Sequence, residues 1–177
     1  MKLADLSPLF ARRIERGPAF AFQEFRADPV LAPLRWPDCV LEQFLYEHGG
    51  SHLPFEEDYG HIDLEGITWR LEMISRTDFR DMPTGASEAG LIDHIAENPV
   101  YWVSVRPERI GCHWEDHGTW MRPPLLIDRR LLAPPDGGLQ VLEGRTRVGV
   151  LRGRLREGLK VAPCHQAWVG RPREASA

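Results

Sequence analysis

The sequence predicts an α/β (α+β) fold in which an N-terminal, mainly helical region packs on a C-terminal mixed sheet with helices. Three observations support this prediction. Apolar residues recur at helical spacing between residues 38 and 48. Residues 66–74 alternate between apolar and polar side chains, with the two-residue period of a half-buried strand. The pattern of residues 139–156 predicts an apolar strand, a glycine turn and a basic helix.

The N-terminal half has weak patterning at first and clearer patterning later. Four prolines among mixed apolar and charged residues predict short helices and loops over the first 36 residues. The elements expected next are a helix at 38–48 capped by Asp38 and ended by Gly49 and Gly50, a loop at 52–60, the strand at 66–74, a turn at 80–86 and a short helix at 87–95 that Pro99 stops.

A boundary near Pro99 divides the chain into residues 1–97, of unknown role, residues 98–170, and a polar tail at 171–177. The elements expected after it are strands at 100–105, 125–127, 139–142 and 161–169, and a helix at 145–156. Val148, Leu151 and Leu155 give this helix a face toward the sheet, while Gly149 and Gly153 favour close backbone packing.

Composition excludes several classes of protein. The 177 residues carry 22 basic and 26 acidic side chains, a net charge of -4, and no apolar run long enough to cross a bilayer. We therefore expect a cytoplasmic protein without a membrane partner. The cysteines Cys39, Cys112 and Cys164 lie far apart, so we expect free thiols rather than a disulfide framework or a cysteine zinc site.

One segment of this acidic chain is basic. Residues 144–160 hold six cations and one acid, on a helix that begins directly after a strand and Gly144. Such a helix start presents unpaired N–H groups and the positive end of the helix dipole, which favours an anion, and Arg145 and Arg147 add charge. The alternative is a solvated basic face on a surface helix.

The segment Glu143-Gly144-Arg145-Thr146-Arg147 resembles the Gly-x-x-Arg phosphate-binding motif of the ParB/sulfiredoxin superfamily. Residues 118–127 look like the strand element that precedes this motif, and residues 161–169 fit the closing strand, so the likeness covers about residues 100–170. Arg145 stands where sulfiredoxin has its cysteine, and Arg122 stands where ParB-like domains have glutamine. Reduction of a sulfinic acid is therefore not expected.

The resemblance implies a site for a nucleoside triphosphate with Mg²⁺. Gly144 would let the phosphate approach and Arg147 would contact it. Phosphate contacts are then expected from Gly144, Arg145, Thr146 and Arg147, with Arg122 assisting.

A second group of polar residues is His113-Trp114-Glu115-Asp116-His117, which Gly111 and Gly118 bracket as a loop. The loop precedes a strand expected beside the Gly-x-x-Arg turn. Glu115 or Asp116 is a candidate to hold Mg²⁺ on the nucleotide, and Glu115, Asp116 or His117 is a candidate general base. The alternative is a polar surface loop. No resident metal site is expected.

The functional hypothesis is therefore binding of a nucleoside triphosphate, with hydrolysis or phosphate transfer left open. A non-catalytic protein-interaction module of the same fold, with a protein partner on residues 1–97, is the first alternative. Nucleic-acid binding or cleavage through the basic helix is the second, and the net charge of -4 weakens it.

Overall fold

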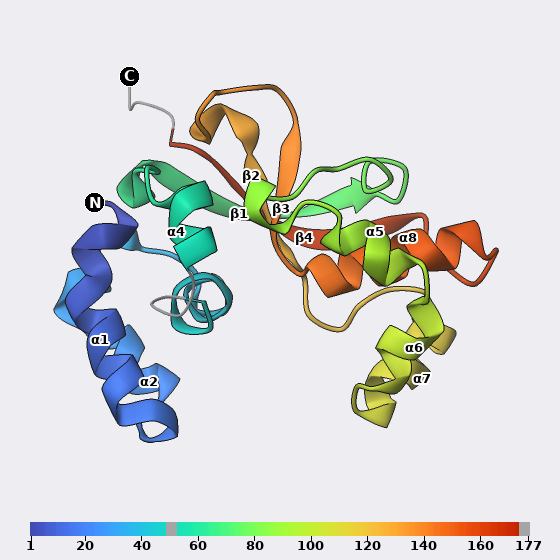
Figure 1. Ribbon diagram of the computed structural model, residues 1–177, viewed down its shortest axis with the longest axis horizontal. Helices are drawn as coiled ribbons and strands as arrows, with labels where there is room; N and C mark the ends of the chain where they lie inside the picture. Colours follow the sequence, from blue (N-terminus) through green and yellow to red (C-terminus); the bar gives the residue numbers. More distant parts are fainter. Residues whose placement is uncertain (49–52, 174–177) are drawn as a thin grey trace.

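The computed structural model describes residues 1–48 and 53–173 and has a mixed α+β architecture (Figure 1). Its sheet has four strands in the order β1-β4-β2-β3. Strand β4 is antiparallel to β1 and parallel to β2, and β2 is antiparallel to β3. The strands are β1 (Ile67–Ser75), β2 (Leu125–Asp128), β3 (Leu139–Glu143) and β4 (Cys164–Pro172).

Short helices make up most of the rest of the described chain. The α-helices are α1 (Ser7–Arg16), α2 (Phe22–Arg26), α3 (Asp38–Val40), α4 (Leu53–Tyr59), α5 (Leu91–Ala96), α6 (Pro99–Ser104), α7 (Glu108–His117) and α8 (Arg145–Arg156). The π-helical segment η4 (Leu41–Tyr46) continues α3, and the 3-10 turns are η1 (Leu3–Leu6), η2 (Gly17–Ala19), η3 (Pro29–Leu34), η5 (Leu64–Gly66), η6 (Ala86–Glu88) and η7 (Arg129–Leu131).

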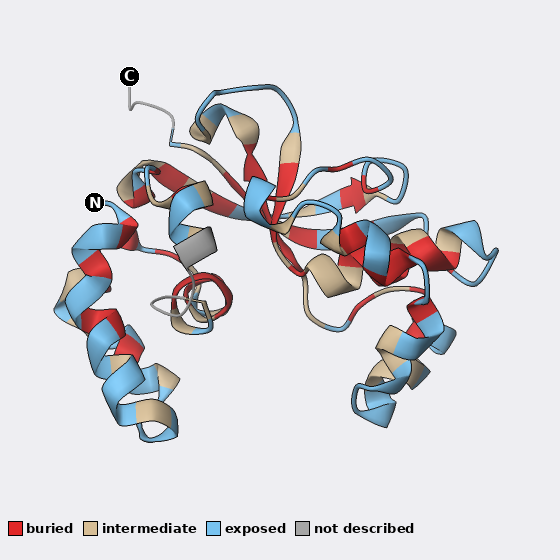
Figure 2. Cartoon of the chain, viewed as in Figure 1, coloured by how far each residue is buried: buried red, intermediate tan, exposed pale blue. Residues whose placement is uncertain are grey.

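The sheet separates two apolar cores. Because side chains alternate along a strand, Leu125 and Ile127 enter the core beneath the N-terminal helices, while Leu126 enters the core beneath α5 and α8. Buried residues form a continuous band through the strands, α5 and α8 (Figure 2). The predicted arrangement of an N-terminal helical region and a mixed sheet is therefore confirmed.

Helix α8 begins and ends where the sequence predicts and packs tightly on α5. A Cβ atom on Gly149 would lie 2.6 Å from Cβ of Ile95, and one on Gly153 would lie 2.6 Å from the carbonyl oxygen of Ala96. Any larger side chain at these two positions would push the helices apart. The predicted close packing at the two glycines is confirmed.

The expected strand at 100–105 is wrong, because Pro99–Ser104 is helix α6. Asn98 caps this helix by accepting a hydrogen bond from the Tyr101 N–H, and Pro99 occupies its first turn, where no N–H is needed. Val100 and Tyr101 are more than half exposed. The apolar run therefore belongs to a surface helix and not to a strand covered on both faces.

Two expected loops are also helices. The segment expected as a loop at 52–60 contains α4, and the one expected between Gly111 and Gly118 is the second half of α7. Gly118 ends α7 with a φ of 65°, the left-handed conformation common after a helix. Gly111 lies inside the helix, and the Gly49–Gly50 pair falls outside the described residues.

Strand β4 begins after Pro163, later than predicted, and runs to Pro172. Its partner β1 precedes the boundary placed near Pro99, and the two strands pair from Ile67↔Pro172 to Ser75↔Cys164. The sheet is thus shared between the segments 1–97 and 98–170, and Arg171 and Pro172 are strand residues. Within the described ranges, no helix is long and apolar enough to span a bilayer.

Candidate functional site

A cavity of about 570 Å³ lies at the start of α8. Its walls come from the end of the η4 segment, from α5, from the α6–α7 pair, from the loop before β2 and from the first turns of α8. The lining residues are Glu47, His48, Leu91, Trp102, Val103, Arg106, Arg109, Ile110, Trp114, Trp120, Met121, Arg122, Glu143, Gly144, Arg145, Thr146, Arg147 and Val150. The structure thus brings together all five residues of the predicted phosphate site.

Gly144 connects β3 to α8 and is required there on two grounds. Its φ of 95° is a conformation that residues with a side chain rarely adopt. A Cβ atom would lie 2.5 Å from Cβ of Pro124 and 2.9 Å from Nε of Arg147. The space that a side chain at this position would occupy is therefore filled by Pro124 and Arg147, while Gly144 itself lines the cavity.

Arg147 lies largely buried between three segments of the chain and is not a free cation. Its guanidinium donates to the carbonyl oxygen of Arg122 at 2.9 Å, to Oε1 of Gln43 at 3.0 Å, and to Glu143, with which it forms an ion pair. These partners come from the loop before β2, from η4 and from β3. One side chain thus links the N-terminal helices, the sheet and α8.

The electrostatics of Glu143 reflect the same arrangement. Burial alone would raise the pKa of this carboxyl group, but a hydrogen bond from His48 and the charges of Arg147 and Arg145 lower its pKa to about 2. Burial lowers the pKa of Arg147, and Glu143 opposes that shift. The pair is charged in the folded protein, and each partner compensates the other's burial.

The other two predicted phosphate arginines also have acidic partners. Arg122 contacts Glu42 at 2.7 Å and Glu47 at 2.8 Å, and Arg145 contacts Glu88 at 2.6 Å. All three arginines of the predicted phosphate site are therefore neutralised within the protein.

The remaining arginines of α8 are occupied as well. Arg152 donates to the carbonyl oxygens of Phe79 and Met82 and pairs with Asp93. Arg154 is 2% exposed and pairs with Glu115, while Arg156 donates to the carbonyl oxygen of Ala96. The basic segment therefore does not form a free basic face.

Two arginines without acidic partners among the described residues line the opposite wall of the cavity. Arg106 follows α6 and Arg109 lies in the first turn of α7, and both line the cavity. Neither makes an ion pair or side-chain hydrogen bond with any residue in the described ranges 1–48 and 53–173. Among the described lining residues, five arginines stand against two glutamates, and both glutamates are already paired.

Backbone donors and aromatic rings complete the site. Gly144 has no side chain with which to cap α8, and no side chain caps its first turn, so the N–H groups at its start are available. Trp102, Trp114 and Trp120 also line the cavity, the last two largely buried. The site combines donors for an anion with surfaces for an apolar or aromatic group.

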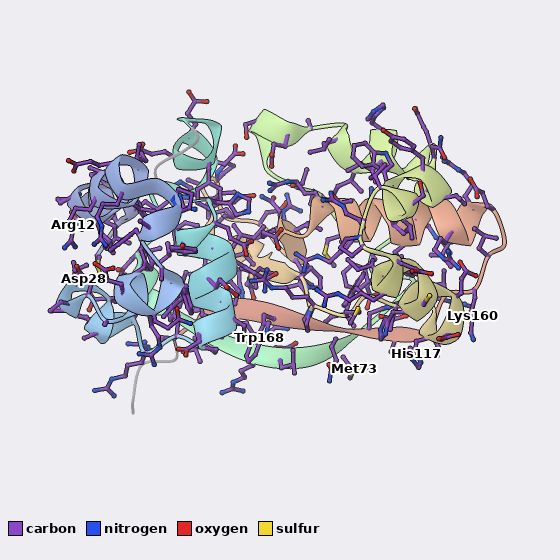
Figure 3. The ribbon with its side chains drawn as sticks, turned by 90° about the horizontal axis from the view of Figure 1, so that it is seen from below. Arg12, Asp28, Met73, His117, Lys160 and Trp168 are labelled. Atoms are coloured by element: carbon purple, nitrogen blue, oxygen red, sulfur yellow. The ribbon has the colours of Figure 1, made fainter. Side chains whose placement is uncertain are left out.

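The three candidate catalytic residues do not line this cavity. Glu115 is held by Arg154 at 2.9 Å, which lowers the pKa of its carboxyl group, and the Asp116 carbonyl oxygen accepts from Nζ of Lys160 at 2.7 Å. His117 packs against His113 one turn away and lies near Lys160 at one end of the molecule (Figure 3). Helix α7 lines the cavity through Arg109, Ile110 and Trp114 instead.

Sequence reasoning missed Arg106 and Arg109. Residues 100–105 were expected to form a strand, which hid the helical hairpin that positions both arginines. The available signal was Asn98-Pro99, a helix start, followed by Pro107, which begins a second helix. The described residues contain no group of three or more His, Cys, Asp or Glu side chains placed to hold a metal ion.

Comparison with known proteins gives no relative: no family model, curated protein or solved structure matches the chain.

Proposed function

We propose that the cavity at the start of α8 binds a nucleoside triphosphate. The observation that carries the proposal is the pair Arg106 and Arg109, which lack acidic partners in the described chain and line the same cavity as the uncapped start of α8. Unpaired guanidinium groups and helix N–H groups are the donors that bind phosphates in proteins.

The roles of the residues differ from those that the resemblance implies. Arg106 and Arg109 would contact the phosphates together with the N–H groups of Arg145 and Thr146. Arg122 and Arg147 would hold the walls in place, because their guanidinium groups are bound to Glu42, Glu47 and Glu143. A partly exposed Trp102 offers a ring on which a base can stack.

Magnesium would arrive with the phosphates. Glu115 is committed to Arg154, and neither Glu115 nor Asp116 lines the cavity. Mg²⁺ ordinarily keeps several waters and is shared between one or two protein ligands and the substrate phosphates. The proposal therefore concerns binding, and turnover would need a base from another side chain.

Nucleic-acid binding through α8 has less support than a small ligand. Each of the five arginines on α8 already donates to a carboxylate or carbonyl group of the protein. A phosphate backbone would have to compete with those bonds, and the binding energy of such proteins comes mainly from free positive charge.

The test is a thermal-unfolding screen against ATP, CTP, GTP and UTP, each with and without Mg²⁺. A ligand that binds only the folded state raises the midpoint by mass action. We expect a rise of several degrees with at least one triphosphate, and a smaller rise in Arg106→Ala and Arg109→Ala.

Arg80→Ala is the matched control, because Arg80 is exposed and lies outside this cavity. It should respond to the nucleotide as the wild type does. A rise that is equal in all four proteins would contradict the assignment of the site, and no rise with any triphosphate would contradict the ligand class.

A further inference from the structure

Strand β1 is an edge of the sheet with little protection. It runs for nine residues, contains no proline, and pairs with β4 without a bulge. Edge strands in natural proteins are usually short or interrupted by proline, bulges or several charges, because their free backbone groups recruit other strands. Figure 3 shows β1 along the margin of the molecule.

Two hydrogen bonds that flank β1 establish which backbone groups point outward. The Arg76 N–H donates to the Pro163 carbonyl oxygen at 3.0 Å, and the Arg173 N–H donates to that of Gly66 at 2.7 Å. In an antiparallel ladder, bonded positions recur every second residue. Even-numbered residues of β1 therefore bond to β4, and odd-numbered residues direct their N–H and C=O groups away from it.

The centre of this edge has no partner. No described residue supplies a backbone hydrogen bond to the outward groups of Trp69, Leu71 or Met73. The side chains of Leu71 and Met73 are 44% and 61% exposed, which is unusual for two apolar residues at successive positions on one face of a strand. An apolar strip thus accompanies a row of free donors and acceptors.

The charged residues on the opposite face of β1, Arg70 and Glu72, indicate that its partner is a second copy of the same strand. Arg70 makes no ion pair within the described chain. Glu72 accepts a bond from Arg171 of β4 on each carboxylate oxygen, at 2.9 and 2.8 Å, and is 27% exposed. If a second β1 pairs antiparallel about Leu71, Arg70 lies opposite Glu72 of the other copy, and the reverse, so two ion pairs form.

The two neighbouring symmetric registers fail. Pairing centred on residue 70 would place Arg70 opposite Arg70 of the other copy, and pairing centred on residue 72 would oppose the two Glu72 side chains. In the register centred on Leu71, the outward groups of Leu71 bond to each other, Trp69 meets Met73, and all nine residues of β1 overlap. The facing pairs of residues 70 and 72 are non-hydrogen-bonded pairs, in which side chains come closest.

We propose that two copies of this chain associate through their β1 edges, with a two-fold axis at Leu71, to form one continuous sheet from the two four-stranded sheets. The proposal does not depend on nucleotide binding, because the residues of β1 do not line the cavity at α8.

The experiment measures the molar mass of the full chain in solution over a range of concentrations, by light scattering or sedimentation. We expect twice the chain mass of 20.2 kDa at high concentration. Arg70→Glu places a second carboxylate opposite Glu72 of the other copy and should raise the dimer dissociation constant about tenfold, because two favourable pairs become repulsive. Glu72→Arg should act similarly.

The mixture of these two variants tests the register. Arg70→Glu and Glu72→Arg each carry like charges at the facing positions, but together they place Glu opposite Arg at both. An equimolar mixture should therefore dimerise more strongly than either variant alone. Arg80→Glu, a charge reversal away from β1, is the control and should dimerise as the wild type does. Thermal unfolding of each variant verifies that it is folded.

A cross-link gives an independent measurement. In a chain with the exposed Cys112 and Cys164 replaced by serine, Leu71→Cys should form a disulfide dimer, because opposed Cα atoms lie about 5.5 Å apart. Met73→Cys should not, since the two substituted positions would lie roughly 13 Å apart along the strands. A monomer at every concentration would overturn the proposal, as would a dimer that neither charge reversal weakens and that Leu71→Cys does not cross-link.

Discussion

The two sides of the cavity at α8 both carry arginines, but they use them differently. On the α8 side, Arg122, Arg145 and Arg147 are bound to carboxylates, and Arg147 also reaches two further segments of the chain. On the α6–α7 side, Arg106 and Arg109 have no acidic partner among the described residues. Charge that holds a wall together and charge that is available to a ligand are therefore separated in space.

Packing follows the same division. The strands, α5 and α8 are lined with buried residues, whereas α6 and α7 each bury one, Pro99 and Trp114 (Figure 2). A cluster of arginines in a sequence therefore does not indicate an anionic ligand until the arginines that form ion pairs within the protein are identified.

Removing the Arg147 side chain should damage the fold. Arg147→Ala removes the ion pair of the largely buried carboxylate of Glu143, to which His48 still donates, and removes bonds to Gln43 and Arg122. The loss of one member of a buried pair typically costs about 3–5 kcal/mol of the free energy of unfolding. Urea denaturation would measure it. If Arg147→Ala unfolds like the wild type but no longer binds a nucleotide, Arg147 is a ligand contact and the division is wrong.

Lowering the pH should reduce the free energy of unfolding through the protonation of Glu143. Glu143 has a pKa of about 2 when folded and about 4.5 when unfolded, so the unfolded chain binds more protons between these values. This contribution, up to about 3 kcal/mol, is present above pH 4.5 and is lost as the pH falls toward 2. Unfolding free energies of wild type and Glu143→Gln between about pH 6 and pH 2 would show the difference shrinking in that window.

A second group contributes at higher pH and has to be separated from Glu143. Burial lowers the pKa of His165 to about 4, below the 6.5 of an unfolded histidine. The unfolded chain therefore binds more protons between these values, and the free energy of unfolding declines as the pH falls from about 6.5 to 4. Both wild type and Glu143→Gln retain His165 and share this decline. A difference between them that changes mainly above pH 4.5 would contradict the assignment to Glu143.

Gly144→Ala should destabilise through both geometry and contact. Its φ is 95°, and the added Cβ would collide with Pro124 and with Arg147, so we expect a cost of about 2–3 kcal/mol. Gly90→Ala is the matched control, since Gly90 has a φ of 84° but nothing within 4 Å of its Cβ position. Its cost should be about 1 kcal/mol. Equal costs in denaturant unfolding would show that the contact with Arg147 does not matter.

Substitutions of Arg106 and Arg109, on the α6–α7 side of the cavity, should have the smallest effect on stability. Arg106→Ala and Arg109→Ala should change the free energy of unfolding by less than about 0.5 kcal/mol, because neither side chain has a partner in the described chain. Each should weaken nucleotide affinity about tenfold, the loss expected for one bond to a charged group. Calorimetric titration would measure the affinity, and a large loss of stability would contradict the comparison.

Much of the fold could be predicted from local patterns. Strand β1 alternates clearly, β3 and α8 join at a glycine, and the glycines of α8 indicated a close neighbour, which proved to be α5. The segment at 100–105 could not be assigned from apolar content alone, because a short apolar run fits a buried strand and a surface helix equally well. The cap at Asn98 decides between them.

The site was harder to predict for a different reason. The sequence places Arg145 and Arg147 beside the helix start. Glu143, four residues before Arg147, is a local signal for its ion pair, but Glu88 and Gln43, the other partners, lie far away along the chain. Ion pairs between distant segments depend on tertiary structure and have no local pattern. Arg106 and Arg109 could not be identified from the sequence for the same reason, because only the folded structure shows that they have no such partners among the described residues.

Strand β4 has a consequence for how the chain folds during synthesis. It is the last strand of the sheet to be made, yet it lies between β1 and β2. Until residues 164–172 emerge from the ribosome, β1 has no neighbour, and the two cores lack the strand that separates them. Domains with such distant pairings tend to fold late and slowly. A nascent chain stalled before residue 164 should remain open to proteases, and one that carries an added linker after residue 177, so that β4 is outside the ribosome, should resist them.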